Sequence, residues 1–260
     1  MRPSSSLVVV ITGASSGIGA ALAHHLGGRG DRLVLAARRE EELSRVARDS
    51  SAEALPVVTD VRHRDQVERL RDQAIARFEK VDVWINNAGR GVGYKVMELS
   101  EADFDEMIAV NVKSALFGMQ AIVPHFIERQ QGHLINVSSY LSRVPAVSFR
   151  SGYNAAKHAL NALTANLRMD LRREYPRIHV SLVMPGLVDT EFQKNALGGT
   201  PIPPLPGGPI QPQTADEVAA AIVALIDTPQ AEIYTNPAQR EMVQRYFADV
   251  AKFEEGMRVP

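Results

Sequence analysis

Cysteine is absent from the 260 residues of this chain. Its absence excludes a disulfide framework, a thiolate metal site and a cysteine nucleophile, and it favours a reducing compartment. An excess of charge of one sign is also lacking, because 29 Lys and Arg residues stand against 30 Asp and Glu residues, a formal net charge of -1. Balanced charge argues against a general nucleic-acid-binding protein.

Long hydrophobic runs are missing as well. The longest apolar run near the N-terminus, Leu7–Ile11, leads directly into Thr12 and Gly13. A signal peptide needs a longer apolar region, and a membrane-spanning helix needs about 20 apolar residues. We therefore expect a cytoplasmic protein without a membrane span. The 45% of hydrophobic residues still suffices for a buried core, which excludes disordered and collagen-like classes.

Short apolar runs alternate with longer amphipathic stretches along the chain. Consecutive apolar residues, such as Val8–Val10, are typical of strands buried on both faces of a parallel sheet. The alternation predicts right-handed βαβ units and a Rossmann-like, doubly wound α/β domain over residues 1–260, with about seven strands and helices on both faces. The expected strands are Leu7–Ile11, Arg32–Ala37, Leu55–Thr59, Val81–Ile85, His133–Val137, Ile178–Met184 and Glu232–Thr235. The expected helices are Gly17–Leu26, Arg39–Arg48, Arg64–Phe78, Ala102–Glu128, Gly152–Tyr175 and Ala215–Ile226.

Two segments depart from this alternation. Prolines and glycines crowd residues 198–213, where neither a helix nor a central strand is expected, so residues 192–214 form either a surface linker or a substrate lid. The C-terminal tail, residues 237–256, has the pattern of one polar helix over Ala238–Glu255. We expect its Phe247, Val250 and Ala251 to pack on the body of the same chain, with packing on another subunit as the alternative.

A glycine-rich turn follows the first strand and opens the first helix. Gly13, Gly17 and Gly19 permit unusual backbone angles and the close approach of a phosphate, which the N–H groups of the helix start favour. Ser15, Ser16 and Ile18 lie in the same turn. A structural tight turn is the alternative. The stretch resembles the cofactor turn of the classical short-chain dehydrogenase/reductase family.

The end of the second strand predicts which dinucleotide binds. No acid stands there to accept from the ribose hydroxyls, and the resemblance implies that Ala37 occupies the place of an aspartate in NAD-preferring members. Arg38 and Arg39 follow, and a guanidinium binds a 2′-phosphate through charge-assisted hydrogen bonds. We therefore expect NADP(H) in preference to NAD(H). In the alternative, Arg38 and Arg39 only begin a solvated helix.

The third and fourth strands end in further candidates for the cofactor site. The resemblance implies that Asp60 faces the adenine amino group with the Val61 backbone nearby, whereas chemistry alone allows Asp60 to be a helix N-cap. Asn86–Gly89 looks like the family's Asn-Asn-Ala-Gly motif, in which Asn87, Ala88 and Gly89 line the cofactor. The alternative is an Asn-rich turn that closes a strand.

Tyr153 and Lys157 stand four residues apart in a helical pattern and therefore share one helix face. A nearby ammonium favours the phenolate and lowers the pKa of a tyrosine, so the pair supplies a tunable acid/base. A surface pair at this spacing is common by chance. The fifth strand, however, ends at Ser138 and Ser139, where a hydroxyl faces the ligand crevice and can stabilise a developing oxyanion.

The resemblance assigns roles to these side chains. Its usual serine-to-tyrosine spacing falls on Tyr140, so we infer a one-residue insertion within Leu141–Gly152 and assign the catalytic serine to Ser139, with Ser138 left open. Asn111 matches the family's helix asparagine, which holds a water linked to the lysine. A buried Asn satisfied by backbone groups is the alternative.

After the sixth strand, Pro185 and Gly186 resemble the family's turn around the nicotinamide. The resemblance implies that the Val188 backbone and the Thr190 hydroxyl fix the carboxamide. The seven histidines are scattered, and no pair combines with acids at metal-ligand spacing, so no metal site is expected.

Together these motifs predict an NADP(H)-dependent oxidoreductase that moves a hydride between the nicotinamide and a carbonyl or alcohol substrate, with Ser139, Tyr153, Lys157 and Asn111 as catalytic residues. A non-catalytic NADP(H)-binding sensor or scaffold on the same fold is the alternative. The resemblance implies a homodimer or homotetramer. Substrate choice would fall to Arg90–Met97, Tyr140–Ser151 and Phe192–Gln213, whose apolar residues suit a moderately hydrophobic carbonyl.

Overall fold

The computed structural model describes residues 6–50, 53–192, 195–198 and 211–256. Seven parallel strands form one sheet in the order β3-β2-β1-β4-β5-β6-β7, which confirms the predicted doubly wound α/β fold. The strands are β1 (Val8–Thr12), β2 (Arg32–Ala37), β3 (Ala54–Val58), β4 (Val83–Asn86), β5 (Gly132–Val137), β6 (Ile178–Met184) and β7 (Glu232–Tyr234).

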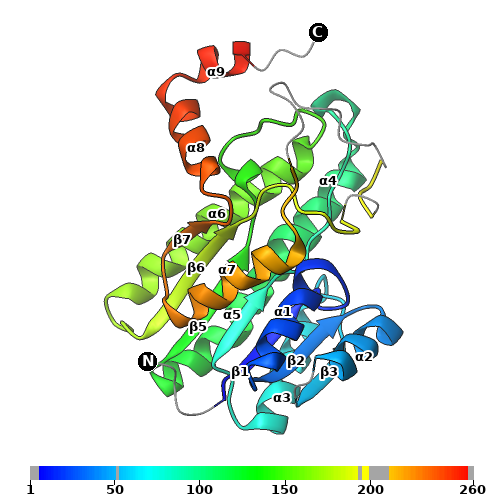
Figure 1. Cartoon of the computed structure of the whole chain (residues 1–260), viewed down its shortest axis with the longest axis vertical. Coiled ribbons are helices and arrows are strands. Elements are labelled where there is room, and N and C mark those ends of the chain that lie inside the picture. The colour runs from blue at the N-terminus through cyan, green and yellow to red at the C-terminus, as the bar shows by residue number, and fades with distance from the viewer. Residues whose placement is uncertain (1–5, 51–52, 193–194, 199–210, 257–260) are drawn as a thin grey trace.

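Helices cover both faces of the sheet (Figure 1). One face packs against α1 (Gly17–Gly28), α2 (Glu40–Asp49) and α7 (Ala215–Asp227). The other packs against α3 (Arg64–Phe78), α5 (Ser114–Arg129) and α6 (Ser151–Arg172). Val9 and Ile11 point into the first layer, and Val8 and Val10 into the second. Because both faces are buried, every position of β1 is apolar except its last, which explains the consecutive apolar runs.

The stretch predicted as one helix over Ala102–Glu128 is a continuous helical run with a wider turn inside it. It consists of α4 (Glu101–Ile108), a π-turn at Ala109–Lys113, and α5. Periodicity alone did not reveal the π-turn, because one extra residue leaves the apolar pattern almost intact. The run is long and apolar enough to cross a membrane. However, 61% of its most apolar stretch is buried inside the protein, and α5 packs on β4 and β5. It is therefore a core helix.

The C-terminal tail differs from the prediction in two respects. It forms two helices, α8 (Ala238–Ala248) and α9 (Val250–Gly256), because Asp249 is extended and its carboxylate accepts the backbone N–H of Lys252, which starts a new helix. The helices extend from one end of the molecule (Figure 1), and Phe247 is 63% exposed and Val250 41% exposed. The expected packing of Phe247, Val250 and Ala251 on the body is therefore wrong.

An aromatic cluster replaces that packing. The Tyr246 ring contacts the Phe247 ring and the Phe253 ring at centroid distances of 5.2 and 5.4 Å. The first turn of α8 does reach the body, because Gln239 is buried there. Most of the predicted lid, residues 199–210, lies outside the described residues, as do Gln193 and Lys194.

His133 provides a pH-dependent contribution to the stability of this fold. Its side chain in β5 is buried, with Nε2 2.8 Å from Ser181 Oγ and its ring 5.7 Å from that of His179. Burial, with a smaller contribution from His179, lowers the pKa of His133 to about 3. Below pH 6.5 His133 is therefore protonated in the unfolded chain, whereas in the folded chain it stays neutral down to about pH 3.

We predict that His133→Gln removes part of the acid sensitivity of folding. The His133 contribution is fully present above pH 6.5 and is lost on acidification by about 1.4 kcal/mol per pH unit. Urea unfolding at a series of pH values measures it, with the exposed His24→Gln as the control. A variant whose free energy of unfolding falls as steeply with acid as the wild type would contradict this account.

Candidate active site

The glycine-rich turn between β1 and α1 adopts the backbone angles that glycine allows. Gly13 and Gly17 have φ of 68° and 54°, in the left-handed region. A Cβ on Gly19 would lie 2.3 Å from the Gly13 carbonyl oxygen, so only glycine fits there. Ser16 precedes α1 without capping it through its side chain, and no acid stands in the first helical turn. The first N–H groups of α1 are thus left for an anion.

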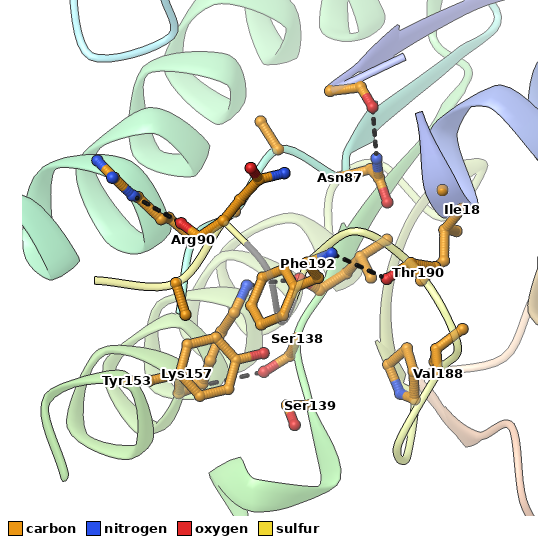
Figure 2. Close-up of a pocket in the computed structure, with 18 of the residues that line it drawn as sticks. Ile18, Asn87, Arg90, Ser138, Ser139, Tyr153, Lys157, Val188, Thr190 and Phe192 are labelled. Carbon is orange, nitrogen blue, oxygen red and sulfur yellow. Dashed lines mark hydrogen bonds between the residues drawn. The ribbon is translucent and has the colours of Figure 1, made fainter. Parts of the chain in front are cut away.

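The turn is fastened to the end of β4 by Thr12. Its hydroxyl donates to the Ile85 carbonyl at 3.3 Å and accepts the backbone N–H groups of Asn87 and Ala88 at 3.0 and 3.1 Å. The Asn87 side chain donates in return to the Thr12 and Gly13 carbonyls at 2.9 and 3.3 Å (Figure 2). Asn87 therefore braces the turn as well as lining the cavity beside it.

Arginines border the far end of that cavity. Arg38 is exposed at its wall, and Arg39 Nη2 donates to the Ser16 and Ser15 hydroxyls at 2.9 and 3.2 Å. Arg39 Nη1 also lies 3.5 Å from Glu42 and 3.6 Å from Glu191. The guanidinium of Arg39 is thereby held against the glycine-rich turn.

Asp60 lies in the same wall and is bound by Arg62. Arg62 Nη2 stands 2.6 Å from Asp60 Oδ2, and these hydrogen bonds hold the pKa of Asp60 below its usual range. Asp60 is not the N-cap of α3, since His63 takes that position. Arg62 also contacts Glu106, which contacts Arg90, so a chain of ion pairs runs along this side of the cavity.

Helix α6 brings Tyr153 and Lys157 to the other end of the cavity. They lie one turn apart and are 8% and 3% exposed, and Lys157 Nζ donates to the Val137 carbonyl at 3.0 Å. Ser139, just beyond β5, faces the same space (Figure 2). The Ser138 hydroxyl instead donates to Asn161 Oδ1 at 2.7 Å. This geometry favours Ser139 over Ser138 as the serine beside Tyr153.

Burial dominates the protonation of both α6 side chains. It raises the pKa of Tyr153 to about 12, against a hydrogen bond from Ser139 and the charge of Arg150, which act in the opposite direction. It lowers the pKa of Lys157 to about 7. The expected lowering of the Tyr153 pKa by the Lys157 ammonium is not among these effects, and burial decides the direction of the shift.

Asn111 lies in the π-turn and fixes the loop after β4. Its Nδ2 donates to the Arg90 and Met107 carbonyls at 2.9 and 3.1 Å, and its Oδ1 accepts the Arg90 N–H at 3.2 Å. Backbone groups thus satisfy the hydrogen-bonding capacity of the Asn111 side chain, which agrees with the alternative of a buried structural asparagine. Gly89 lies between Asn111 and Lys157, since a Cβ there would be 3.1 Å from Asn111 Oδ1 and 3.6 Å from Lys157 Nζ.

The turn after β6 forms a further part of the cavity wall through Pro185, Gly186, Val188 and Thr190. Thr190 Oγ1 accepts the Phe192 N–H at 3.3 Å, and its methyl group lies against Gly17. Gly186 lies against the buried Gln239 of α8, because a Cβ on Gly186 would be 2.2 Å from Gln239 Nε2. Among the described residues, Gln239 Oε1 is one of a few buried side-chain atoms without a hydrogen-bond partner.

One cavity of 870 Å³ joins these parts, which is large among ligand sites. Only two predicted site residues, Gly19 and Asn111, lie behind its wall. The predicted residues in the wall are Gly13, Ser15, Ser16, Gly17, Ile18, Arg38, Arg39, Asp60, Val61, Asn87, Ala88, Gly89, Ser139, Tyr153, Lys157, Pro185, Gly186, Val188 and Thr190.

Several polar residues of the wall were not singled out from the sequence, Arg62, Arg150 and Gln239 among them. Gln239 carries no local signal, since it lies in a polar helix far along the chain. Arg150 falls in the Tyr140–Ser151 segment that was expected to influence substrate choice, but only its spacing of three residues before Tyr153 hinted at a place beside the tyrosine, and its 3% exposure was not expected.

Comparisons with known proteins agree with this geometry. The family model described as short chain dehydrogenase matches residues 7–199. An uncharacterized oxidoreductase of Listeria innocua is 38% identical over 188 residues, covering 71% of this chain and 75% of that protein. An uncharacterized oxidoreductase of Staphylococcus aureus is 36% identical over 184 residues, covering 70% and 78%.

Two solved structures share the whole architecture. A short-chain dehydrogenase/reductase from Burkholderia phymatum in complex with NAD has a TM-score of 0.86 at 28% identity, covering 100% of this chain and 99% of that one. A short-chain dehydrogenase from Burkholderia cenocepacia in complex with NADP has a TM-score of 0.81 at 28% identity, covering 98% of each.

We predict that Thr12→Val destabilises the protein whereas Thr12→Ser does not. Valine leaves the N–H groups of Asn87 and Ala88 without their acceptor, at a cost of about 2 kcal/mol in the free energy of unfolding, while serine keeps the hydroxyl. Urea unfolding of both variants measures the difference. Equal stability of the two would show that the hydroxyl does not fasten the turn.

Proposed function

The chain belongs to the short-chain dehydrogenase family, and from this premise we propose that it is an NADP(H)-dependent oxidoreductase acting on a carbonyl or alcohol group of a small molecule. The observation that carries the proposal is the shared cavity, with an uncapped helix start among glycines at one end and Ser139, Tyr153 and Lys157 at the other. Such a cavity suits a dinucleotide whose reactive ring meets a proton donor.

The residues present fit that cofactor. The glycine angles at Gly13 and Gly17 and the free N–H groups of α1 suit a pyrophosphate. Pro185, Gly186, Val188 and Thr190 would hold the nicotinamide end, and Asp60, Val61, Asn87, Ala88 and Gly89 the adenosine end. When bound, the nicotinamide supplies or accepts the hydride.

The chain's own side chains would handle the oxygen and the proton. In the direction of reduction, the Ser139 hydroxyl donates a hydrogen bond to the substrate carbonyl oxygen, and the Tyr153 hydroxyl gives that oxygen its proton. Lys157 would bind the nicotinamide ribose, and its pKa of about 7 lets it release and regain a proton near neutral pH. Asn111 keeps the loop at Arg90 in place beside it.

The preference for NADP(H) rests on charge at the adenosine end. The wall holds Ala37 where an acid would repel a 2′-phosphate, and it holds Arg38 and Arg39. The position of Arg39 against Ser15 and Ser16 supports a second phosphate ligand besides Arg38.

The catalytic end favours a moderately hydrophobic substrate. The cavity there is lined by Leu141, Val147, Phe192 and Ala196.

Homo-oligomeric assembly and a cytoplasmic location stay predictions.

We predict that NADPH supports reduction of one or more aldehydes, ketones, quinones or steroids, and that Tyr153→Phe abolishes it. Phenylalanine removes the proton donor but fills the same buried space, so cofactor binding persists. Initial rates with NADPH and NADH side by side over such a panel, with Kd by fluorescence, measure this. Undiminished turnover in the Tyr153→Phe variant would overturn the mechanism. A wild-type protein that binds NADPH but turns over none of the substrates would favour the sensor.

We predict that Arg38→Ala and Arg39→Ala each weaken NADPH binding about tenfold or more and leave NADH binding nearly unchanged, because a charge-assisted hydrogen bond contributes about 1.5–3 kcal/mol. The exposed Arg45→Ala on α2 is the matched control. Tighter binding of NADH than of NADPH by the wild type would show that the arginines serve another purpose.

A further inference from the structure

Arg150 is a buried cation beside the catalytic tyrosine. It is the N-cap residue of α6, is 3% exposed and lines the cavity. Its Nη1 donates to the Val92 carbonyl at 3.1 Å. Burial of a guanidinium is costly, so a charge retained at a functional cavity points to a role there.

The surroundings of Arg150 and Tyr153 overlap. The two residues stand three apart at the start of α6, which places them on one helix face. The Phe192 ring lies beside the Tyr153 ring, with centroids 5.6 Å apart (Figure 2). A Cβ on Gly91 would be 3.0 Å from Phe192 Cε1 and 2.7 Å from Arg150 Nη1. The Phe192 ring and the Arg150 guanidinium therefore both lie against Gly91.

Few other charges act on the Tyr153 hydroxyl. From α6 it faces Lys157, whose Nζ is 5.7 Å from the ring centroid, and burial lowers the pKa of Lys157 to about 7, so part of this positive charge is absent at neutral pH. From the end of β5 it faces the uncharged Ser139. The described carboxylates in the cavity wall are Asp60 and Glu191, which pair with Arg62 and Arg39. Burial lowers the pKa of Arg150 as well, but a guanidinium stays protonated at any working pH, so the charge of Arg150 persists.

Electrostatic effects are strong in this setting. Tyr153 and Arg150 are both shielded from water, so their interaction is weakened less than between surface groups. The charge of Arg150 opposes the rise in the pKa of Tyr153 that burial causes.

We propose that Arg150 is a positioning residue of the reaction, whose buried guanidinium stabilises the phenolate of Tyr153 and so sets the pH range in which this tyrosine gives and takes the proton. The inference rests on the proposed function, because it needs Tyr153 to be the acid/base. Arg150 lies outside the Ser-Tyr-Lys-Asn set and acts on the reaction through Tyr153.

The test separates the charge of Arg150 from its hydrogen bond to the Val92 carbonyl. Arg150→Gln removes the charge but keeps an N–H donor for the Val92 carbonyl, and Arg150→Lys keeps a charge. Arg172→Met, at an exposed position of the same helix, is the control. The readout is the pH profile of kcat/KM for alcohol oxidation, which requires the phenolate and therefore rises through the pKa of Tyr153.

We expect the profile of Arg150→Gln to move to higher pH by about one unit, a loss of about tenfold in oxidation at a fixed pH below the pKa. Arg150→Lys moves it less, Arg172→Met leaves it in place, and the Kd for NADPH stays unchanged in all three. Should the glutamine variant fail to fold, Gly91→Ala displaces the guanidinium without removing it and moves the profile in the same direction.

An equal loss at every pH in Arg150→Gln, with the profile unmoved, would overturn the proposal and leave Arg150 as a support for residues 91–93. An ultraviolet titration of Tyr153, taken as the difference from Tyr153→Phe, needs no turnover. It gives a higher pKa in Arg150→Gln if the inference holds and the same pKa if it fails. Failure of the proposed function is distinct, since the wild type would then reduce no carbonyl or the Tyr153→Phe variant would keep its activity.

Discussion

The parallel direction of all seven strands is the constraint on which the rest of the structure depends. Parallel strands end at one edge of the sheet, so the loops after β1, β2, β3, β4, β5 and β6 meet around a single cavity. Each of these loops contributes polar side chains to the wall, although the residues lie far apart along the chain. Thr12 and Asn87 then hold two of the loops at a fixed distance.

Charge is distributed unevenly along this cavity. At the end that holds Arg38 and Arg39 the cations are exposed or paired with carboxylates, as Arg39 is with Glu42 and Glu191. At the opposite end Lys157 and Arg150 are buried beside the buried Tyr153. The first end suits recognition of a phosphate in water, and the second suits proton transfer, since charges act strongly where water is excluded.

The C-terminal tail belongs to the site through its first turn alone. Gln239 is buried against Gly186 and lines the cavity, whereas the rest of α8 and α9 extends from the body with its aromatic rings packed on one another. The family model ends at residue 199, so Gln239 lies beyond the segment that identifies the family. At this end of the cavity, Gln239 comes from beyond the segment that the family model matches, whereas Gly186 beside it lies within that segment.

The sequence by itself determined the strands, most of the helices and most of the cavity wall. Apolar runs such as Leu33–Leu35 mark buried strands, and the spacing of Tyr153 and Lys157 places both on one helix face, because both patterns are local and repeat with the period of the backbone. The tertiary structure alone decided that Ser139 rather than Ser138 faces Tyr153, and that Arg39 reaches Ser15 and Ser16.

Tertiary structure likewise decided the π-turn at Asn111, the break at Asp249, and the burial of Arg150 and Gln239 in the cavity wall. These features depend on which residues, distant along the chain, the fold places beside each side chain. Periodicity carries no record of such contacts, and the pKa of Tyr153 depends on all of them, because burial and neighbouring charges act through space.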